Sequence, residues 1–181
     1  MSSSWLSTPQ TGGTLRRWLV GGGSLSYRIQ QRCANFRVVR LRQALCRAYP
    51  DETQPLGLVY GKVALVREVI LFCGETPVIF AHSVALREDL NGAWRGLRGL
   101  GSRPLASALF DDPRIEHLPL AFRKLNARHP LYRRARQALS ALMDELPPAL
   151  SLWARRRVFL REGAPLLVTE VFLPGILRLP S

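Results

Sequence analysis

The stretch KVALVREVILFCGETPVIFAHSVAL, residues 62–86, decides the fold of this chain. Residues 62–73 and 78–86 are two apolar runs whose side chains alternate between two sets. Such alternation is typical of β-strands, because neighbouring side chains point to opposite faces. The segment Gly74-Glu75-Thr76-Pro77 between the runs is rich in turn-forming residues. The sequence therefore predicts two antiparallel strands joined by a tight turn.

A second hairpin of the same kind lies near the end of the chain. Residues 153–161 alternate, residues 162–165 form a turn with Gly and Pro, and residues 166–173 return before Pro174. Trp153, Arg155, Arg157 and Phe159 share one face of the outgoing strand.

The segments outside the hairpins favour helices. Apolar spacing predicts a helix over residues 131–146, ended by Pro147-Pro148. Residues 88–110 are expected to be helical with a break at residues 99–101, and Pro104 is expected to open the second piece. Residues 114–125 suggest a strand interrupted by Pro119.

The N-terminal part is more varied. Residues 1–14 are rich in Ser, Thr and Gly and are expected to form a flexible arm. After it we expect a short helix over residues 15–20, a helix capped by Ser24, a strand from Phe36 with a bulge at Val38-Val39, and a loop over residues 49–55. Hairpins separated by helices predict an α+β fold, a single domain over residues 15–181 built on an antiparallel β-sheet.

The charge composition restricts the classes of ligand that this chain is expected to bind. The 181 residues carry 26 Lys and Arg against 13 Asp and Glu, a formal net charge of +13. The arginines are spread along the chain and form no long basic tail, so the charge alone does not predict a nucleic-acid partner. It does suit a small anionic substrate, because a positive protein attracts anions and raises their encounter rate.

The three cysteines are Cys33, Cys46 and Cys73, an odd number without a CxxC spacing. We therefore expect neither a disulfide framework nor a zinc site, and a reduced, cytoplasmic compartment. No apolar run reaches the roughly 18–20 residues that span a bilayer, and the N-terminus lacks the pattern of a signal peptide.

Two charged residues stand where strand patterning requires an apolar one. Arg67 lies between Leu65 and Val69 on its face, and Glu170 lies between Val168 and Phe172 on its face. A charge in an apolar strand face is costly unless it is paired. Either the two residues form structural ion pairs, with each other or with another charged group, or each keeps a free side for a ligand. Arginine offers a planar fork for a carboxylate, and glutamate can accept a hydrogen bond or a proton.

Other polar residues give weaker signals. His82 shares its strand face with Phe80 and Val84 and is interpreted as a satisfied core or edge histidine rather than a ligand. The Arg155-Arg156-Arg157 run alternates across its strand, and an exposed sheet face explains it without a ligand.

Three segments together resemble the chorismate pyruvate-lyase family. Residues 65–71 with the Gly-Glu-Thr-Pro turn resemble its central hairpin, residues 100–110 resemble its Leu-Gly-x-x-Pro-Leu segment, and residues 155–174 resemble its C-terminal hairpin. The segments follow the family's order. The stretch from about residue 123 to 150 is longer than in the family form and holds the extra helix.

The resemblance implies an antiparallel sheet whose helices close over a buried ligand site. It implies a carbon–oxygen lyase that converts chorismate to 4-hydroxybenzoate and pyruvate for ubiquinone biosynthesis, with no metal or organic cofactor. Arg67 would hold the ring carboxylate and Glu170 would face the 4-hydroxyl, either as a base or only to orient it. The Leu105 backbone would contact the same end of the ring, and Leu25 falls at the family's N-terminal contact position.

The expected partners are therefore chorismate and 4-hydroxybenzoate, with no nucleic acid and no membrane span, and the chain is expected to be a monomer. One alternative is a non-catalytic domain of the same fold that binds a small aromatic acid, as in the effector domains of some bacterial transcription regulators. Another is an arginine-rich nucleic-acid binder, which steep salt-dependent affinity would reveal.

Overall fold

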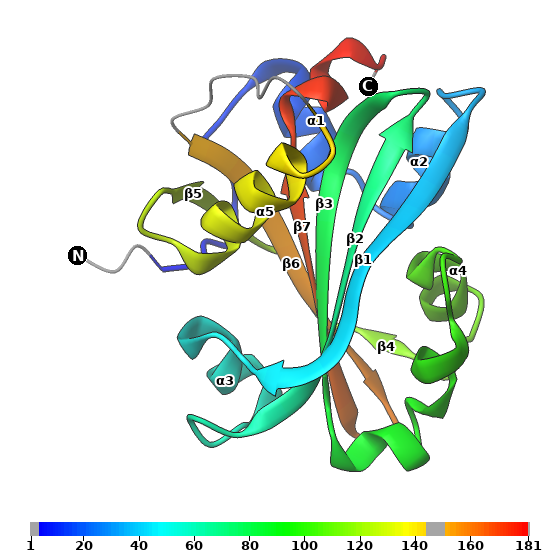
Figure 1. Cartoon of the computed structure of the whole chain (residues 1–181), viewed down its shortest axis with the longest axis vertical. Coiled ribbons are helices and arrows are strands. Elements are labelled where there is room, and N and C mark those ends of the chain that lie inside the picture. Colours follow the sequence, from blue (N-terminus) through cyan, green and yellow to red (C-terminus); the bar gives the residue numbers. More distant parts are fainter. Residues whose placement is uncertain (1–3, 144–150, 181) are drawn as a thin grey trace.

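Seven strands form one antiparallel sheet in the computed structural model, which describes residues 4–143 and 151–180 (Figure 1). The order is β1-β2-β3-β7-β6-β4, and β5 also pairs with β6. The two hairpins lie side by side, because β3 of the first pairs with β7 of the second. The strands are β1 (Phe36–Arg47), β2 (Val63–Cys73), β3 (Thr76–Leu86), β4 (Glu116–His117), β5 (Ala121–Asn126), β6 (Ser151–Arg161) and β7 (Ala164–Phe172).

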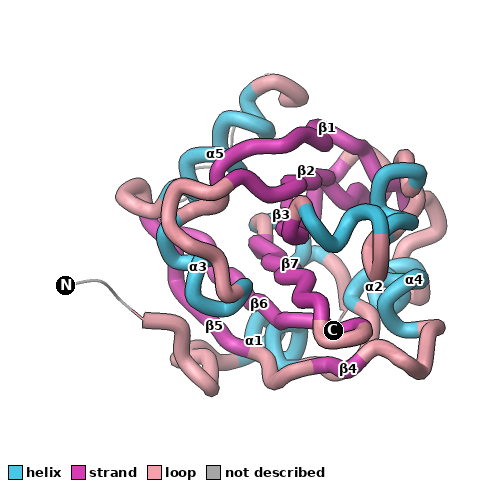
Figure 2. Tube along the Cα trace, turned by 90° about the horizontal axis from the view of Figure 1, so that it is seen from below, coloured by secondary structure: helices cyan, strands magenta, loops and turns pink. Residues whose placement is uncertain are grey.

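Helices cover both faces of this sheet. The α-helices are α1 (Gly13–Val20), α2 (Leu25–Gln30), α3 (Pro50–Leu56), α4 (Leu105–Phe110) and α5 (Pro130–Ser140), and the 3₁₀ helices are η1 (Glu88–Asn91), η2 (Arg95–Gly99) and η3 (Pro174–Arg178). Figure 2 shows α2 and α4 on one side of the central strands and α3 on the other. None of the helices in the described part of the chain is long and apolar enough to cross a membrane.

The two sheet faces carry different side chains of β2. The Arg67 face, with Leu65 and Val69, packs under α1, α2 and α4, and the Glu68 face, with Val66 and Ile70, packs under α3 and α5. The alternation read from the sequence is therefore confirmed, as are both hairpins and the α+β fold class.

Several local predictions were wrong. Residues 50–56 form α3 rather than a loop, because Pro50 opens the helix and Glu52 accepts a hydrogen bond from the Tyr49 N–H, which caps it. The bulge in β1 lies between Arg40 and Arg42 instead of at residues 38–39. The helical expectation for residues 88–110 was better: η1 and η2 are short 3₁₀ helices, and α4 begins directly after Pro104.

The helix expected over residues 131–146 is present as α5, and the part of that prediction from residue 144 on lies outside the described residues. At the N-terminus, Leu6 forms an isolated β-bridge with Phe122, and the Trp5 indole donates a hydrogen bond to Asp51. The domain boundary expected after residue 14 stays a prediction.

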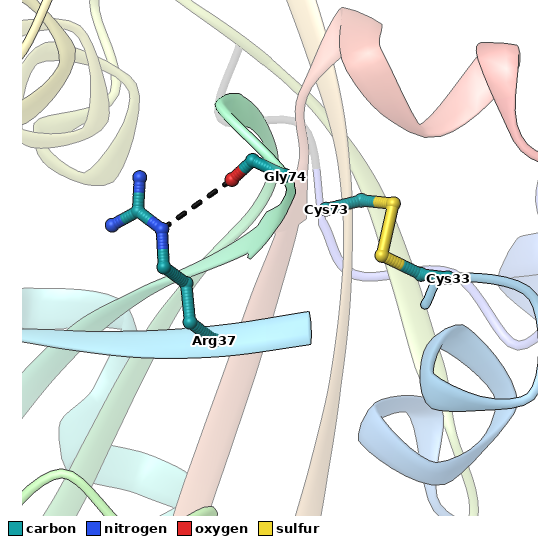
Figure 3. The surroundings of a disulfide bond; sticks show 4 residues. All are labelled: Cys33, Arg37, Cys73 and Gly74. Atoms are coloured by element: carbon teal, nitrogen blue, oxygen red, sulfur yellow. Dashed lines mark hydrogen bonds between the residues drawn. A yellow bond between two sulfur atoms is a disulfide. The ribbon is translucent and has the colours of Figure 1, made fainter. Parts of the chain in front are cut away.

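A disulfide joins Cys33, which follows α2, to Cys73 at the end of β2 (Figure 3). The expectation of unpaired cysteines was wrong for these two, and Cys46 is a free thiol. The distance along the chain hid the pair, because the two cysteines are 40 positions apart in the sequence. The β1–β2 register places Phe36, three residues after Cys33, opposite Cys73. The Cα atoms of Cys33 and Cys73 are 5.7 Å apart.

We expect oxidised protein to show one reactive thiol in denaturant, that of Cys46. The double replacement Cys33→Ser with Cys73→Ser is expected to lower the free energy of unfolding by about 2–4 kcal/mol, because the crosslink restricts the unfolded chain. Cys46→Ser is the matched control and should leave the free energy of unfolding unchanged. Three reactive thiols in protein purified without reductant would contradict the pairing.

A buried ionic cluster lies on the Glu68 face. His82 Nε2 is 3.0 Å from a Glu52 oxygen, and Nδ1 is 3.3 Å from Glu68, which also pairs with Arg134. Tyr49 stacks on the imidazole with ring centroids 5.4 Å apart. His82 is thus a buried core histidine that lies at ion-pair distance from two carboxylates. Burial alone would lower the pKa of His82, but Glu52 and Glu68 outweigh burial and raise it to about 9.

Stability should therefore fall as the pH rises through about 9. The raised pKa stabilises the folded state fully below the unfolded value of about 6.5, and that contribution, about 3 kcal/mol, is lost as His82 deprotonates. Urea unfolding of the wild type between pH 6 and 10 measures the loss, and an NMR titration of the His82 ring should give a midpoint near the same pH. An imidazole that titrates near pH 6.5 in the folded protein would contradict this assignment.

Candidate functional site

Four central strands place two rows of side chains on the Arg67 face. Residues directly opposite each other in an antiparallel sheet point to the same face, and successive rows lie about 7 Å apart along the strands. In the order β2, β3, β7, β6, the first row is Arg67, Ser83, Val168 and Arg157, and the second row is Val69, Ala81, Glu170 and Arg155.

All eight of these residues line one cavity between the sheet and the helices that cover it. Ala81 and Ser83 form the middle of the floor, and their short side chains leave room between the charged groups at either side. Gly23 and Ser26 at α2, and Leu105 and neighbouring residues of α4, line it from above. The site is therefore a largely apolar space with charges only at selected positions.

Arg67 is buried, with 4% of its surface exposed. Its Nη2 donates to the carbonyl oxygens of Gly101 and Arg103 at 3.1 and 3.0 Å, and its buried Nε has no hydrogen-bond partner in the described part of the chain. Burial, and then the charge of Arg40, lower the pKa of Arg67 to about 10, so it stays a cation at neutral pH. No carboxylate lies within ion-pair distance of Arg67 among the residues that the structure describes.

Glu170 is paired with a different arginine. Its Oε2 accepts a hydrogen bond from Arg155 Nε at 2.5 Å, and Arg155 Nη1 donates to the carbonyls of Leu19 and Gly21. Within the described chain, Oε1 of Glu170 forms no hydrogen bond. Arg67 and Glu170 therefore do not neutralise each other, and both line the cavity.

Arg155 and Arg157 were missed as site residues. We interpreted the arginine run as an exposed sheet face, but Arg155 is only 3% exposed, and both it and Arg157 line the cavity. Arg156 points to the other face, toward Asp51 and the Trp5 ring. The alternation had already placed Arg155 and Arg157 beside Phe159. The sequence did not reveal that helices cover this end of the sheet.

The two leucines differ in their relation to the cavity. Leu105 begins α4 and is part of the lining. The Leu25 side chain is buried in the core with Trp18 and Ile29, and Leu25 is absent from the lining, whereas Gly23 and Ser26 on either side of it belong to it. The structure thus does not bring the Leu25 side chain to the site, and a backbone contact there stays a prediction.

The cavity favours an anionic ligand. Three guanidinium groups and one carboxylate line it, so its charged side chains carry a net charge of +2 at neutral pH. The remaining lining is mostly apolar, including Leu71, Leu109 and Phe159. Across residues 4–143 and 151–180, His, Cys, Asp and Glu form no group that could hold a metal ion. The arrangement fits a flat, apolar molecule that carries negative charge.

Sequence comparison gives one consistent result. The sequence model of the family described as chorismate lyase matches residues 4–178. A probable chorismate pyruvate-lyase of Nitrosomonas europaea is 50% identical over 165 residues, which cover 91% of this chain and 89% of the relative. A probable chorismate pyruvate-lyase of Aromatoleum aromaticum is 48% identical over 183 residues, covering 99% of this chain and 97% of the relative.

Structure comparison finds the same fold in proteins of low identity. The PhnF C-terminal domain superposes with a TM-score of 0.58 at 13% identity, covering 81% of this chain and 87% of that domain. A GntR-family transcriptional regulator from Enterococcus faecalis gives a TM-score of 0.51 at 14% identity, covering 77% and 90%. At these identities the likeness shows the fold alone.

Proposed function

Because the chain belongs to the chorismate lyase family, we propose that it removes pyruvate from chorismate to leave 4-hydroxybenzoate. The observation that carries this proposal is the cavity in which Arg67 and Glu170 lie apart, with small side chains between them. Chorismate carries two carboxylates, and the net charge of +2 on the cavity side chains complements them.

In the proposed pose the substrate ring lies between the two ionic side chains. Arg67 binds the ring carboxylate, since a guanidinium fork with a free Nε can donate to a carboxylate. Glu170 accepts a hydrogen bond from the 4-hydroxyl through Oε1, the oxygen that Arg155 leaves free. The backbone of Leu105 contacts the same end of the ring. These contacts fix the ring lengthwise in an apolar space that excludes water.

The reaction is redox-neutral and needs no co-reactant. The bond between C3 and the ether oxygen breaks, and its electron pair leaves with the enolpyruvate. A proton leaves C4, and the electrons of that C–H bond complete the aromatic ring. The enolpyruvate takes up a proton and becomes pyruvate. Aromatisation drives the process, so the protein mainly orients the substrate and assists one proton transfer.

A second candidate is a non-catalytic domain that binds a small aromatic acid. We consider this function because a GntR-family transcriptional regulator has the same fold as this chain. The same cavity would then bind a carboxylate without producing pyruvate, so a product assay separates the two functions.

Three further features belong to the proposal. We propose that the chain acts in the cytoplasm, that it acts as a monomer, and that its product supplies the ubiquinone ring. The Cys33–Cys73 disulfide removes the argument from unpaired cysteines for a reduced compartment, so the cysteines no longer support the cytoplasmic part of this proposal.

The test is to incubate the purified protein with chorismate and to quantify both products. We expect pyruvate and 4-hydroxybenzoate in equal amounts, at a rate proportional to enzyme concentration. A protein that binds 4-hydroxybenzoate but releases no pyruvate would support the binding domain and overturn the lyase.

A further inference from the structure

Arg157 is a cavity cation that the proposed pose leaves without a role. It lies on β6 directly opposite Val168, at the far end of the row that starts with Arg67. Its Nε is buried and has no hydrogen-bond partner within the described residues. Burial lowers the pKa of Arg157, and the charge of Arg155 adds to this effect.

The other two cavity arginines are already engaged. Arg155 donates to Glu170 and to two backbone carbonyls, and Arg67 donates to two carbonyls of the segment before α4. A partly buried guanidinium whose donors remain free is costly unless an anion enters beside it. Within the described residues, Arg157 is therefore the cavity arginine that has neither a carboxylate at ion-pair distance nor a carbonyl acceptor.

The position of Arg157 matches the second carboxylate of chorismate. Glu170 and Arg157 are diagonal neighbours across β7 and β6, because Glu170 pairs with Arg155, two residues before Arg157. In chorismate the enolpyruvyl side chain is on C3, next to the C4 that carries the hydroxyl. When the 4-hydroxyl contacts Glu170, the neighbouring C3 substituent lies beside Glu170 on the cavity floor. Arg157 is one of the residues beside Glu170 on that floor.

We propose that Arg157 binds the carboxylate of the enolpyruvyl group and so selects substrate over product. The proposal rests on the lyase function argued above. Arg67 contacts a carboxylate that substrate and product share, whereas Arg157 contacts one that leaves with pyruvate. Arg157 thus favours chorismate against the 4-hydroxybenzoate that competes for the same cavity.

The first test compares Arg157→Gln with the wild type in steady-state kinetics and in product binding. We expect KM for chorismate to rise about tenfold or more, since a charge-assisted hydrogen bond is lost. The Kd for 4-hydroxybenzoate should stay within about twofold, because the product lacks this carboxylate. Arg42→Gln, at an exposed position of β1, is the matched control and should change neither value.

A second test needs no turnover. The probe is 3-(carboxymethoxy)-4-hydroxybenzoate, which keeps the ring groups of the product and adds a carboxylate at the C3 position. Wild type should bind this dicarboxylate more tightly than 4-hydroxybenzoate, and Arg157→Gln should lose that preference. An unchanged KM together with an unchanged preference would overturn the role of Arg157 and leave the lyase function standing. A wild type that makes no pyruvate from chorismate would instead refute the lyase function itself.

Discussion

Replacing Arg67 with alanine is expected to lower kcat/KM for chorismate by one to two decades while the protein stays folded. Arg67 is the cation that we propose binds the ring carboxylate, and a charge-assisted hydrogen bond contributes about 1.5–3 kcal/mol. The affinity for 4-hydroxybenzoate should fall by a similar factor, because substrate and product share this carboxylate. Steady-state kinetics and product titration measure the two effects.

Arg67 also donates hydrogen bonds to the carbonyls of Gly101 and Arg103, so its replacement by alanine removes a structural contact as well. Arg67→Gln separates the two roles, since its amide can still donate to a carbonyl but carries no charge. We expect Arg67→Gln to keep the thermal midpoint closer to wild type and to lose activity almost as severely. Wild-type kinetics in both variants would exclude Arg67 as the carboxylate ligand.

Replacing Glu170 with glutamine is expected to remove most turnover and to change the affinity for benzoate little. Glu170 is proposed to accept a hydrogen bond from the 4-hydroxyl. Benzoate lacks that hydroxyl, so the replacement should not alter its affinity. The loss in kcat should be about 10²-fold or more if Glu170 takes the C4 proton, and closer to tenfold if it only orients the hydroxyl. Chorismate deuterated at C4 distinguishes these roles through the isotope effect on kcat.

Glutamine is a better test than alanine at this position. Arg155 is buried and pairs with Glu170, so Glu170→Ala leaves a buried cation without its carboxylate, at a cost of about 3–5 kcal/mol. Glutamine keeps an acceptor oxygen for Arg155. A Glu170→Gln variant with wild-type kcat and KM would refute the assigned contact.

The regular alternation of side chains along the strands allowed much of the sheet to be predicted from the sequence. Arg67 and Glu170 stood out because a charge inside an apolar strand face is costly, and the structure brings both to one cavity. Arg155 and Arg157 did not stand out, because three arginines in a row also fit a solvated strand. Only the tertiary fold shows that α2 and α4 cover the sheet face on which Arg155 and Arg157 lie (Figure 2).

Local sequence patterns did not predict which residues far apart in the chain pair with each other. The Cys33–Cys73 disulfide depends on the β1–β2 register, and sequence spacing does not reveal which strands pair. The α3 helix was readable in principle, since Pro50 and Glu52 form its start, but the two prolines suggested a loop. The direction of the Leu25 side chain was not readable for a similar reason, because a short helix can turn a leucine to the core or to the ligand, and a backbone contact at Leu25 stays a prediction.

The crystal structure of the protein with 4-hydroxybenzoate tests the central claim most directly. We predict the ligand carboxylate within about 3 Å of the Arg67 guanidinium and the phenol oxygen within hydrogen-bond distance of Glu170 Oε1. A ligand bound in the opposite sense, with its carboxylate at Arg155 or Arg157, or bound outside this cavity, would contradict the account.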